Sequence, residues 1–274
     1  MASSNTSTGN SAMTLETGSG WSRGLRNLLR AELGAWFGTR TWLSQILIWA
    51  SAVNLIYLFA SLGMRGNAPP SDAIMVFNVF MGLAGPIGVT IVMQDAIIGE
   101  KRSGTAAWVL SKPVSRLAFI VAKLVANSLG IAVTMVLAQG VIAYFITGLI
   151  NGQWLPLPGY LAALGIHFAN ILFYLTLTVL LGVLFDHPAP VIGIPLAFLF
   201  SQNFLAPQLA QWRPALANAF PWTLAVPVNG GGGLGVAGAL MLGQPTPLLA
   251  LYVALTAAAV FMVLAVALFR RQEL

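Results

Sequence analysis

Long apolar runs dominate the sequence, and short polar stretches separate them. An α-helix needs about 20 apolar residues to cross a bilayer. Six runs reach or approach that length: 41–63, 73–93, 117–150, 160–185, 189–206 and 248–269. We therefore predict an all-α polytopic membrane protein with six transmembrane helices and no separate soluble domain, with the six-span domain filling residues 41–274.

The start of the chain follows a different pattern. Residues 1–20 are mostly Ser, Thr, Gly and Asn and predict a disordered cytoplasmic tail. In residues 21–40, apolar and basic side chains recur separately at three- and four-residue spacing. They are Trp21, Leu25, Leu28, Leu29 and Leu33 on one side, and Arg23, Arg26 and Arg30 on another. This spacing predicts an amphipathic helix lying in the membrane interface.

Charges of both signs cluster only in the loop 94–116, between the second and third apolar runs. A helix leaving the membrane can continue through Glu100, and Ser103-Gly104 then interrupts it. Residues 105–111 can form a short helix with an apolar surface. Pro113 ends it, and Ser115 is a good N-cap for the third span. The loop is therefore predicted to be a short helix between two breaks.

Several residues of this loop form a wider pattern: Glu100, Gly104-Thr105, Leu110-Ser111, Pro113-Val114-Ser115-Arg116 and Lys123. The pattern resembles the signature loop of type-2 ATP-binding-cassette (ABC) exporter permeases, with Ala122 where glycine is usual. The resemblance implies a coupling helix docked on a separate ATPase subunit, which holds ATP and Mg, and a second permease subunit in a homo- or heterodimer. The implied ATPase contacts are Glu100, Arg102, Gly104, Thr105, Trp108, Lys112, Pro113 and Arg116.

Composition and charge set the orientation. The chain is 58% hydrophobic and 7% charged, with a net charge of +6. Placing both termini in the cytoplasm leaves only Arg65 and Arg213 outside, and 11 of the 13 Lys and Arg residues inside. Positive charge is retained on the cytoplasmic side of membrane proteins, so the basic residues need no nucleic-acid partner. The expected location is the inner (plasma) membrane of a prokaryotic cell, in contact with its lipids.

The sequence offers little covalent chemistry. It has no Gly-Lys-Ser or Gly-Lys-Thr phosphate loop, and the glycines at 230–233 precede Leu234. It has no cysteine and two histidines far apart, which makes no metal site. We therefore expect no enzyme activity, cofactor or metal on this chain.

A few polar residues lie within the apolar runs. His167 and Asn170 share a face of the fourth span, and with Asn78 they are candidates to line a substrate path. A lone histidine is more often hydrogen-bonded between helices. Lys123 is expected to extend to the inner membrane interface. The region 207–247 is rich in Pro and Gly and predicts re-entrant or half-helices between the last two spans.

These features favour the permease subunit of an exporter, driven by ATP hydrolysis on another chain. Apolar spans suit a hydrophobic substrate. A secondary transporter is the first alternative, disfavoured because Asp and Glu are almost absent from the spans. A membrane-bound enzyme would need a fuller set of reactive groups than His167 supplies. A non-transporting scaffold or regulator is a further alternative.

Overall fold

The computed structural model describes residues 20–66, 68–111, 114–228 and 234–271, and every regular element in these ranges is a helix. The all-helical prediction is confirmed for this part of the chain. The tail expected over 1–20 lies outside the described residues except for Gly20, and so do the glycines at 230–233.

Within the described residues, six helical segments are long and apolar enough to cross a membrane, as predicted. Three of them contain a π-helical stretch: α2 Thr41–Trp49, η1 Ala50–Leu55 and α3 Ile56–Met64; α4 Pro70–Gln94 and η2 Asp95–Gly99; and α7 Arg116–Ile131, η3 Ala132–Leu137 and α8 Ala138–Ile150. The other three are α9 Leu157–Leu184, α10 Pro188–Trp212 and α13 Leu249–Phe269. The second span extends past its predicted end at residue 93, to Gly99.

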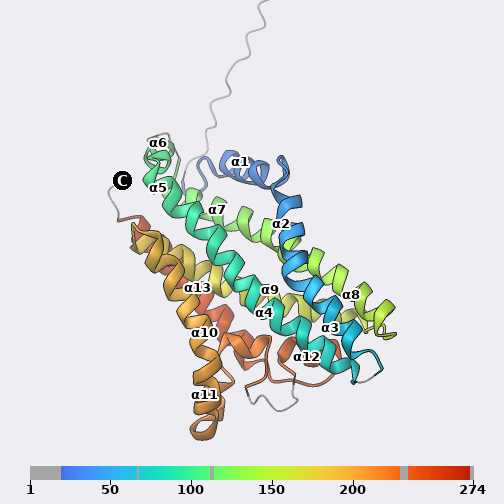
Figure 1. Ribbon diagram of the computed structural model, residues 1–274. Helices are drawn as coiled ribbons and strands as arrows, with labels where there is room; N and C mark the ends of the chain where they lie inside the picture. Colours follow the sequence, from blue (N-terminus) through green and yellow to red (C-terminus); the bar gives the residue numbers. More distant parts are fainter. Residues whose placement is uncertain (1–19, 67, 112–113, 229–233, 272–274) are drawn as a thin grey trace, which may run out of the picture.

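The fourth span, α9, forms the core of the bundle. Protein buries 83% of its apolar stretch, against 22% for the first and sixth spans and 28% for the fifth. α9 packs against α4, α13 and the short α12 (Val236–Met241) (Figure 1). The buried residues Ala250, Ala254 and Ala258 recur every fourth position of α13, and such small side chains let helices approach closely. The outer spans are left to present apolar side chains to lipid.

The fifth span is longer than predicted. The prediction ended it at residue 206, before Pro207, but α10 continues to Trp212 with Pro195 and Pro207 inside it. The prediction was wrong because an interior proline removes one backbone hydrogen bond without ending a long helix whose freed carbonyl finds another partner.

Short helices occupy the region expected to be broken: α11 Pro214–Ala217, the 3-10 helix η4 Pro221–Leu224, and α12. The side chain of Gln202 in α10 connects η4 to the buried core through two hydrogen bonds. Its Oε1 accepts the Trp222 backbone N–H at 3.0 Å, and its Nε2 donates to the Tyr174 hydroxyl at 2.7 Å. A buried side-chain amide thus positions a segment that has little regular structure of its own.

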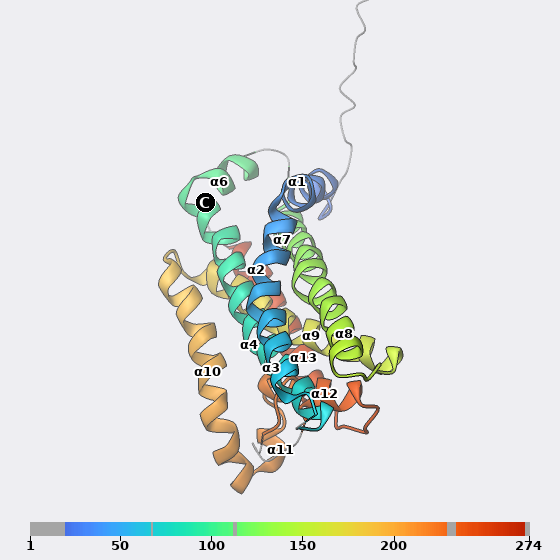
Figure 2. The same cartoon turned by 45° about the vertical axis from the view of Figure 1, so that its right-hand side comes forward.

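Three elements gather at one end of the spans: α1 (Leu25–Phe37), α5 (Glu100–Arg102) and α6 (Thr105–Leu110). α1 lies across the helix ends, while α11 and α12 lie at the opposite end (Figures 1 and 2). Arg116 brings the end of α13 to the same place, because its Nη1 donates to the carbonyl oxygens of Phe269 and Arg270 at 3.4 and 3.2 Å. The amphipathic helix, the charged loop and the end of the sixth span therefore meet.

Candidate functional site

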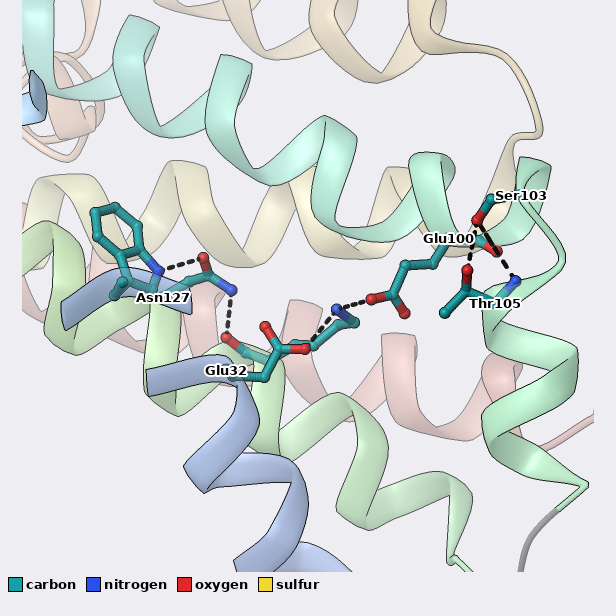
Figure 3. A network of polar contacts seen from close by, with 7 residues as sticks. Glu32, Glu100, Ser103, Thr105 and Asn127 are labelled. Carbon is teal, nitrogen blue, oxygen red and sulfur yellow. Dashed lines mark hydrogen bonds and ion pairs between the residues drawn. The ribbon is translucent and has the colours of Figure 1, made fainter. Parts of the chain in front are cut away.

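The loop between the second and third spans folds as a short helix between two breaks. α5 continues the second span, and Gly104 then turns the chain with a φ of +71°, which favours glycine. The hydroxyl oxygens of Ser103 and Thr105 are 2.8 Å apart across this turn (Figure 3). After α6, the Ser115 side chain caps α7 by accepting the Ala118 N–H at 2.9 Å. The predicted break, short helix and N-cap are therefore present.

A buried lysine joins this loop to α1. Lys123 of α7 is 3% exposed, and its Nζ lies 2.8 Å from Glu32 Oε1 and 2.6 Å from Glu100 Oε1. Glu32 comes from α1 and Glu100 from α5, so one ammonium group connects three elements (Figure 3). We call these three residues the lysine triad. The expectation that Lys123 extends to the interface was wrong, because two carboxylates offset the cost of burying its charge.

The lysine triad carries excess negative charge, since two carboxylates share one ammonium group. Glu100 Oε2 is buried and has no hydrogen-bond partner. Burial raises the pKa of the Glu100 carboxyl above its ordinary value of 4.5; the contact with Lys123 opposes this rise, and the charge of Glu32 adds to it. Burial therefore favours the protonated form of the Glu100 carboxyl.

Trp36, which is 6% exposed, makes a second contact between α1 and α7. Its indole N–H donates to Asn127 Oδ1 at 2.9 Å, and Asn127 Nδ2 donates to the backbone carbonyl of Lys123 at 2.8 Å. The Trp36 ring lies over Gly130, where an added Cβ would come within 2.2 Å of a ring carbon. Trp36 thus fixes α1 on α7 by both a hydrogen bond and ring packing.

A pocket of about 550 Å³ lies between α1, α2, η2 and α7, beside the lysine triad. Its polar lining includes Glu32, Gln45, Asp95, Glu100, Lys123 and Asn127. In the described ranges, no three His, Cys, Asp or Glu side chains are grouped to hold a metal ion. The pocket borders Glu100, whose side chain is 26% exposed.

The residues predicted to contact an ATPase fall into two groups. Glu100 and Arg116 point inward, to Lys123 and to the end of α13. The second group is exposed and consists of Arg102, Thr105 and Trp108. Of the remaining three residues, Gly104 forms the turn, and Lys112 and Pro113 lie outside the described residues. Trp108 of α6 is a large apolar side chain and is 62% exposed.

The candidate path residues lie in the interior, away from the lysine triad. His167 Nε2 and Asn78 Oδ1 are 2.8 Å apart, and they join α9 to α4. Asn78 Nδ2 donates to the Ile74 carbonyl at 2.8 Å, so Oδ1 is the acceptor and His167 Nε2 the donor. His167 Nδ1 and Asn170 Oδ1 are buried without a hydrogen-bond partner. The bond between His167 and Asn78 is of the interhelical kind that is commonest for a lone histidine.

Sequence reasoning missed Glu32 and Trp36 as members of the site. A signal for Glu32 was present, because it falls on the same side of α1 as Leu25, Leu29 and Trp36 by helical spacing. An acidic residue inside an apolar stripe needs a buried partner. The identity of that partner, 91 positions away, was not readable from the spacing.

The fold and this site define a multi-pass helical membrane protein whose charged loop is tied to its N-terminal helix. Residues 41–274 match the profile of a family described as "Protein of unknown function (DUF2705)", and the chain belongs to that family. The matched region contains Glu100 and Lys123, and it begins at the first residue of α2. No curated protein matches the chain.

The raised pKa of Glu100 predicts a pH-dependent stability difference. A carboxyl group whose pKa is raised by folding destabilises the fold when ionised, and this cost is lost as the pH falls below the ordinary value of 4.5. We expect Glu100→Gln to be more stable than the wild type at about pH 7.5, with a gap that closes towards about pH 4.5. Thermal unfolding in detergent across this range measures the gap, and a gap that widens on acidification contradicts the assignment.

Proposed function

We propose that this protein is the membrane-spanning permease subunit of an ABC transporter, an exporter driven by ATP hydrolysis on a separate ATPase subunit. The observation that carries the proposal is α6, a short helix with an exposed Trp108, held between a glycine turn and a capped span at one end of the bundle. A helix bounded in this way can enter a groove of a soluble partner and move as a unit with the spans on either side of it.

The lysine triad supplies the mechanical connection. Glu100 stands at the exit of the second span and Lys123 in the third, so their contact holds together the two spans that flank α6. Arg116 adds the end of the sixth span. In the proposed mechanism Glu100 and Arg116 transmit the movement of α6 to the spans. Arg102, Thr105 and Trp108 contact the ATPase.

The remaining parts of the proposal follow the charge pattern and the family resemblance. The end of the bundle with α1 and α6 faces the cytoplasm of a prokaryotic cell, and the short helices α11, η4 and α12 lie towards the outside, η4 and α12 re-entering the membrane. Two such subunits enclose the path, with ATP and Mg bound by the ATPase. Asn78, His167 and Asn170 are the path candidates, and the cargo is hydrophobic.

Co-expression with any phosphate-loop ATPase that is found encoded beside this gene tests the proposal. The wild-type protein should retain that ATPase through purification, and Trp108→Ala or Gly104→Leu should weaken the complex roughly tenfold or more while leaving the protein in the membrane. The matched control is Trp212→Ala, an 81% exposed tryptophan at the other end of the molecule.

Retention unchanged in both loop variants would reject the assignment of α6 as the docking helix. Failure of the wild-type protein to bind or stimulate any such ATPase would favour the scaffold or secondary-transporter alternatives.

A further inference from the structure

The outward face of α1 is basic and belongs to no site described above. Arg26 and Arg30 lie one helical turn apart on α1, Arg23 lies in the preceding turn, and all three are exposed. Glu32 is the single acidic residue in the α1 sequence, and its carboxylate points inward to Lys123. Because Glu32 pairs with Lys123, the charged side chains on the outward side of α1 are all positive.

Chain connectivity places this face at a definite depth. α1 ends at Phe37 and α2 begins at Thr41, so three residues join the surface helix to the first span. Three residues reach about 10 Å at most, comparable with the headgroup layer that flanks the hydrocarbon core. α1 also lies across the ends of the spans in both views (Figures 1 and 2). Its basic face therefore lies at headgroup level.

An exposed tryptophan lies near each end of α1 in the sequence: Trp21 before it and Trp42 in the first turn of α2. Trp21 is 59% exposed and Trp42 is 38% exposed. Tryptophan is enriched where hydrocarbon meets the headgroups, because its ring is apolar and its N–H is polar. The arginines thus lie between two residues suited to the membrane interface.

The packing of α1 decides how it can interact with lipid. An amphipathic helix ordinarily binds a membrane by burying its apolar face among acyl chains. Here Trp36 is buried against α7, and Leu28 packs on the same core. Protein contacts therefore hold this part of α1 in place, while Phe37, which is 43% exposed, and the arginines remain available to lipid. A preference of α1 for one kind of headgroup must come from the arginines, because apolar contacts do not distinguish headgroups.

We propose that Arg23, Arg26 and Arg30 form a binding surface for the headgroups of anionic phospholipids. Guanidinium groups bind phosphate oxygens through paired hydrogen bonds, and a phosphodiester lipid of net negative charge complements a face that bears only cations. An acidic protein surface could meet the same charges, but the three-residue connection to the first span favours lipid. The assignment does not depend on the proposed transport function.

Lipid retention by the full-length protein tests this surface. The protein is reconstituted in nanodiscs of phosphatidylcholine and phosphatidylglycerol in equal amounts, released into mild detergent, and analysed by native mass spectrometry. The wild type should retain phosphatidylglycerol preferentially, and Arg23→Gln/Arg26→Gln/Arg30→Gln should lower this preference at least about fivefold, since each arginine near an anionic surface contributes a factor of about five. Added salt should weaken it in the wild type.

The control is Arg65→Gln/Arg213→Gln, which removes two exposed arginines that follow α3 and α10 and do not share a helix face, and it should lower the preference less than the triple variant does. Single Arg26→Gln and Arg30→Gln variants should show graded, smaller losses, which separates lost binding from misfolding. An unchanged preference in the triple variant, or an equal loss in the control, overturns the proposal. A triple variant that keeps its lipid preference but loses a protein partner assigns the face to that partner instead.

Discussion

Replacing Lys123 by methionine is expected to lower the free energy of unfolding by about 3 to 5 kcal/mol, the range for breaking a buried ion pair from one side. Methionine keeps much of the side-chain length, although it loses the contact of the ammonium with the Phe119 ring, whose centroid lies 5.3 Å from Nζ. The loss comes from Glu32 and Glu100, which are left facing each other without the ammonium group that bridges them. Equilibrium unfolding in detergent measures the change.

Detachment of α1 should accompany this loss of stability. The chain contains no cysteine, so a cysteine introduced at Leu28 reports on this contact alone. Its reaction with maleimide should be faster in the Lys123→Met background, because Leu28 is part of the face that packs on α7.

Neutralising the two partners should reverse much of the effect. The triple variant Lys123→Met/Glu32→Gln/Glu100→Gln has no unpaired charge in this place, and we expect it to recover most of the lost stability. Arg102→Met is the control, because it removes an exposed cation two residues from Glu100, and it should change stability little. A triple variant no more stable than Lys123→Met would show that the carboxylates are not the cause.

The second large effect is expected for Trp36→Ala, at about 3 to 5 kcal/mol of unfolding free energy. The substitution leaves a cavity between α1 and α7 and removes the donor to Asn127 Oδ1. Trp42→Ala is the control, because Trp42 is a partly exposed tryptophan six residues along the chain. Equal losses in the two variants would contradict the role assigned to Trp36.

Gly130 offers a compensating change. In the wild type, Gly130→Val should itself be destabilising, since its Cβ would clash with the Trp36 ring. In the Trp36→Ala background the same valine has room, and it should restore part of the stability. Unfolding of the four proteins gives the coupling directly, and additive effects of the two changes would rule out the packing described here.

Much of the fold was predictable because it depends on local properties of the chain. The six spans follow from runs of apolar residues, the turn at Gly104 from a residue that tolerates positive φ, and the start of α7 from the capping side chain of Ser115. The end of α10 was predicted too early, because a proline removes one backbone hydrogen bond and a long helix can continue past it, as α10 does past Pro207.

The candidate site was predictable only in part. Glu100 and Lys123 were singled out by their pattern, but their pairing with each other and with Glu32 was not. The sequence did not show which loop residues face the protein and which face outward. In the structure Arg116 contacts the end of α13, whereas Trp108 is exposed. The hydrogen bond between His167 and Asn78 likewise required two spans to be placed side by side.

The amino-acid sequence by itself determined that this chain is a six-span helical protein with a basic N-terminal helix and a helical loop after the second span. Hydropathy, helical spacing and capping are properties of near neighbours, so they can be read in order along the chain. Only the tertiary structure decided that Lys123 is buried between two carboxylates and that α1 packs Trp36 on α7. Those contacts join residues 23 and 91 positions apart, and their strength depends on a shielding from water that exists only once the helices are packed.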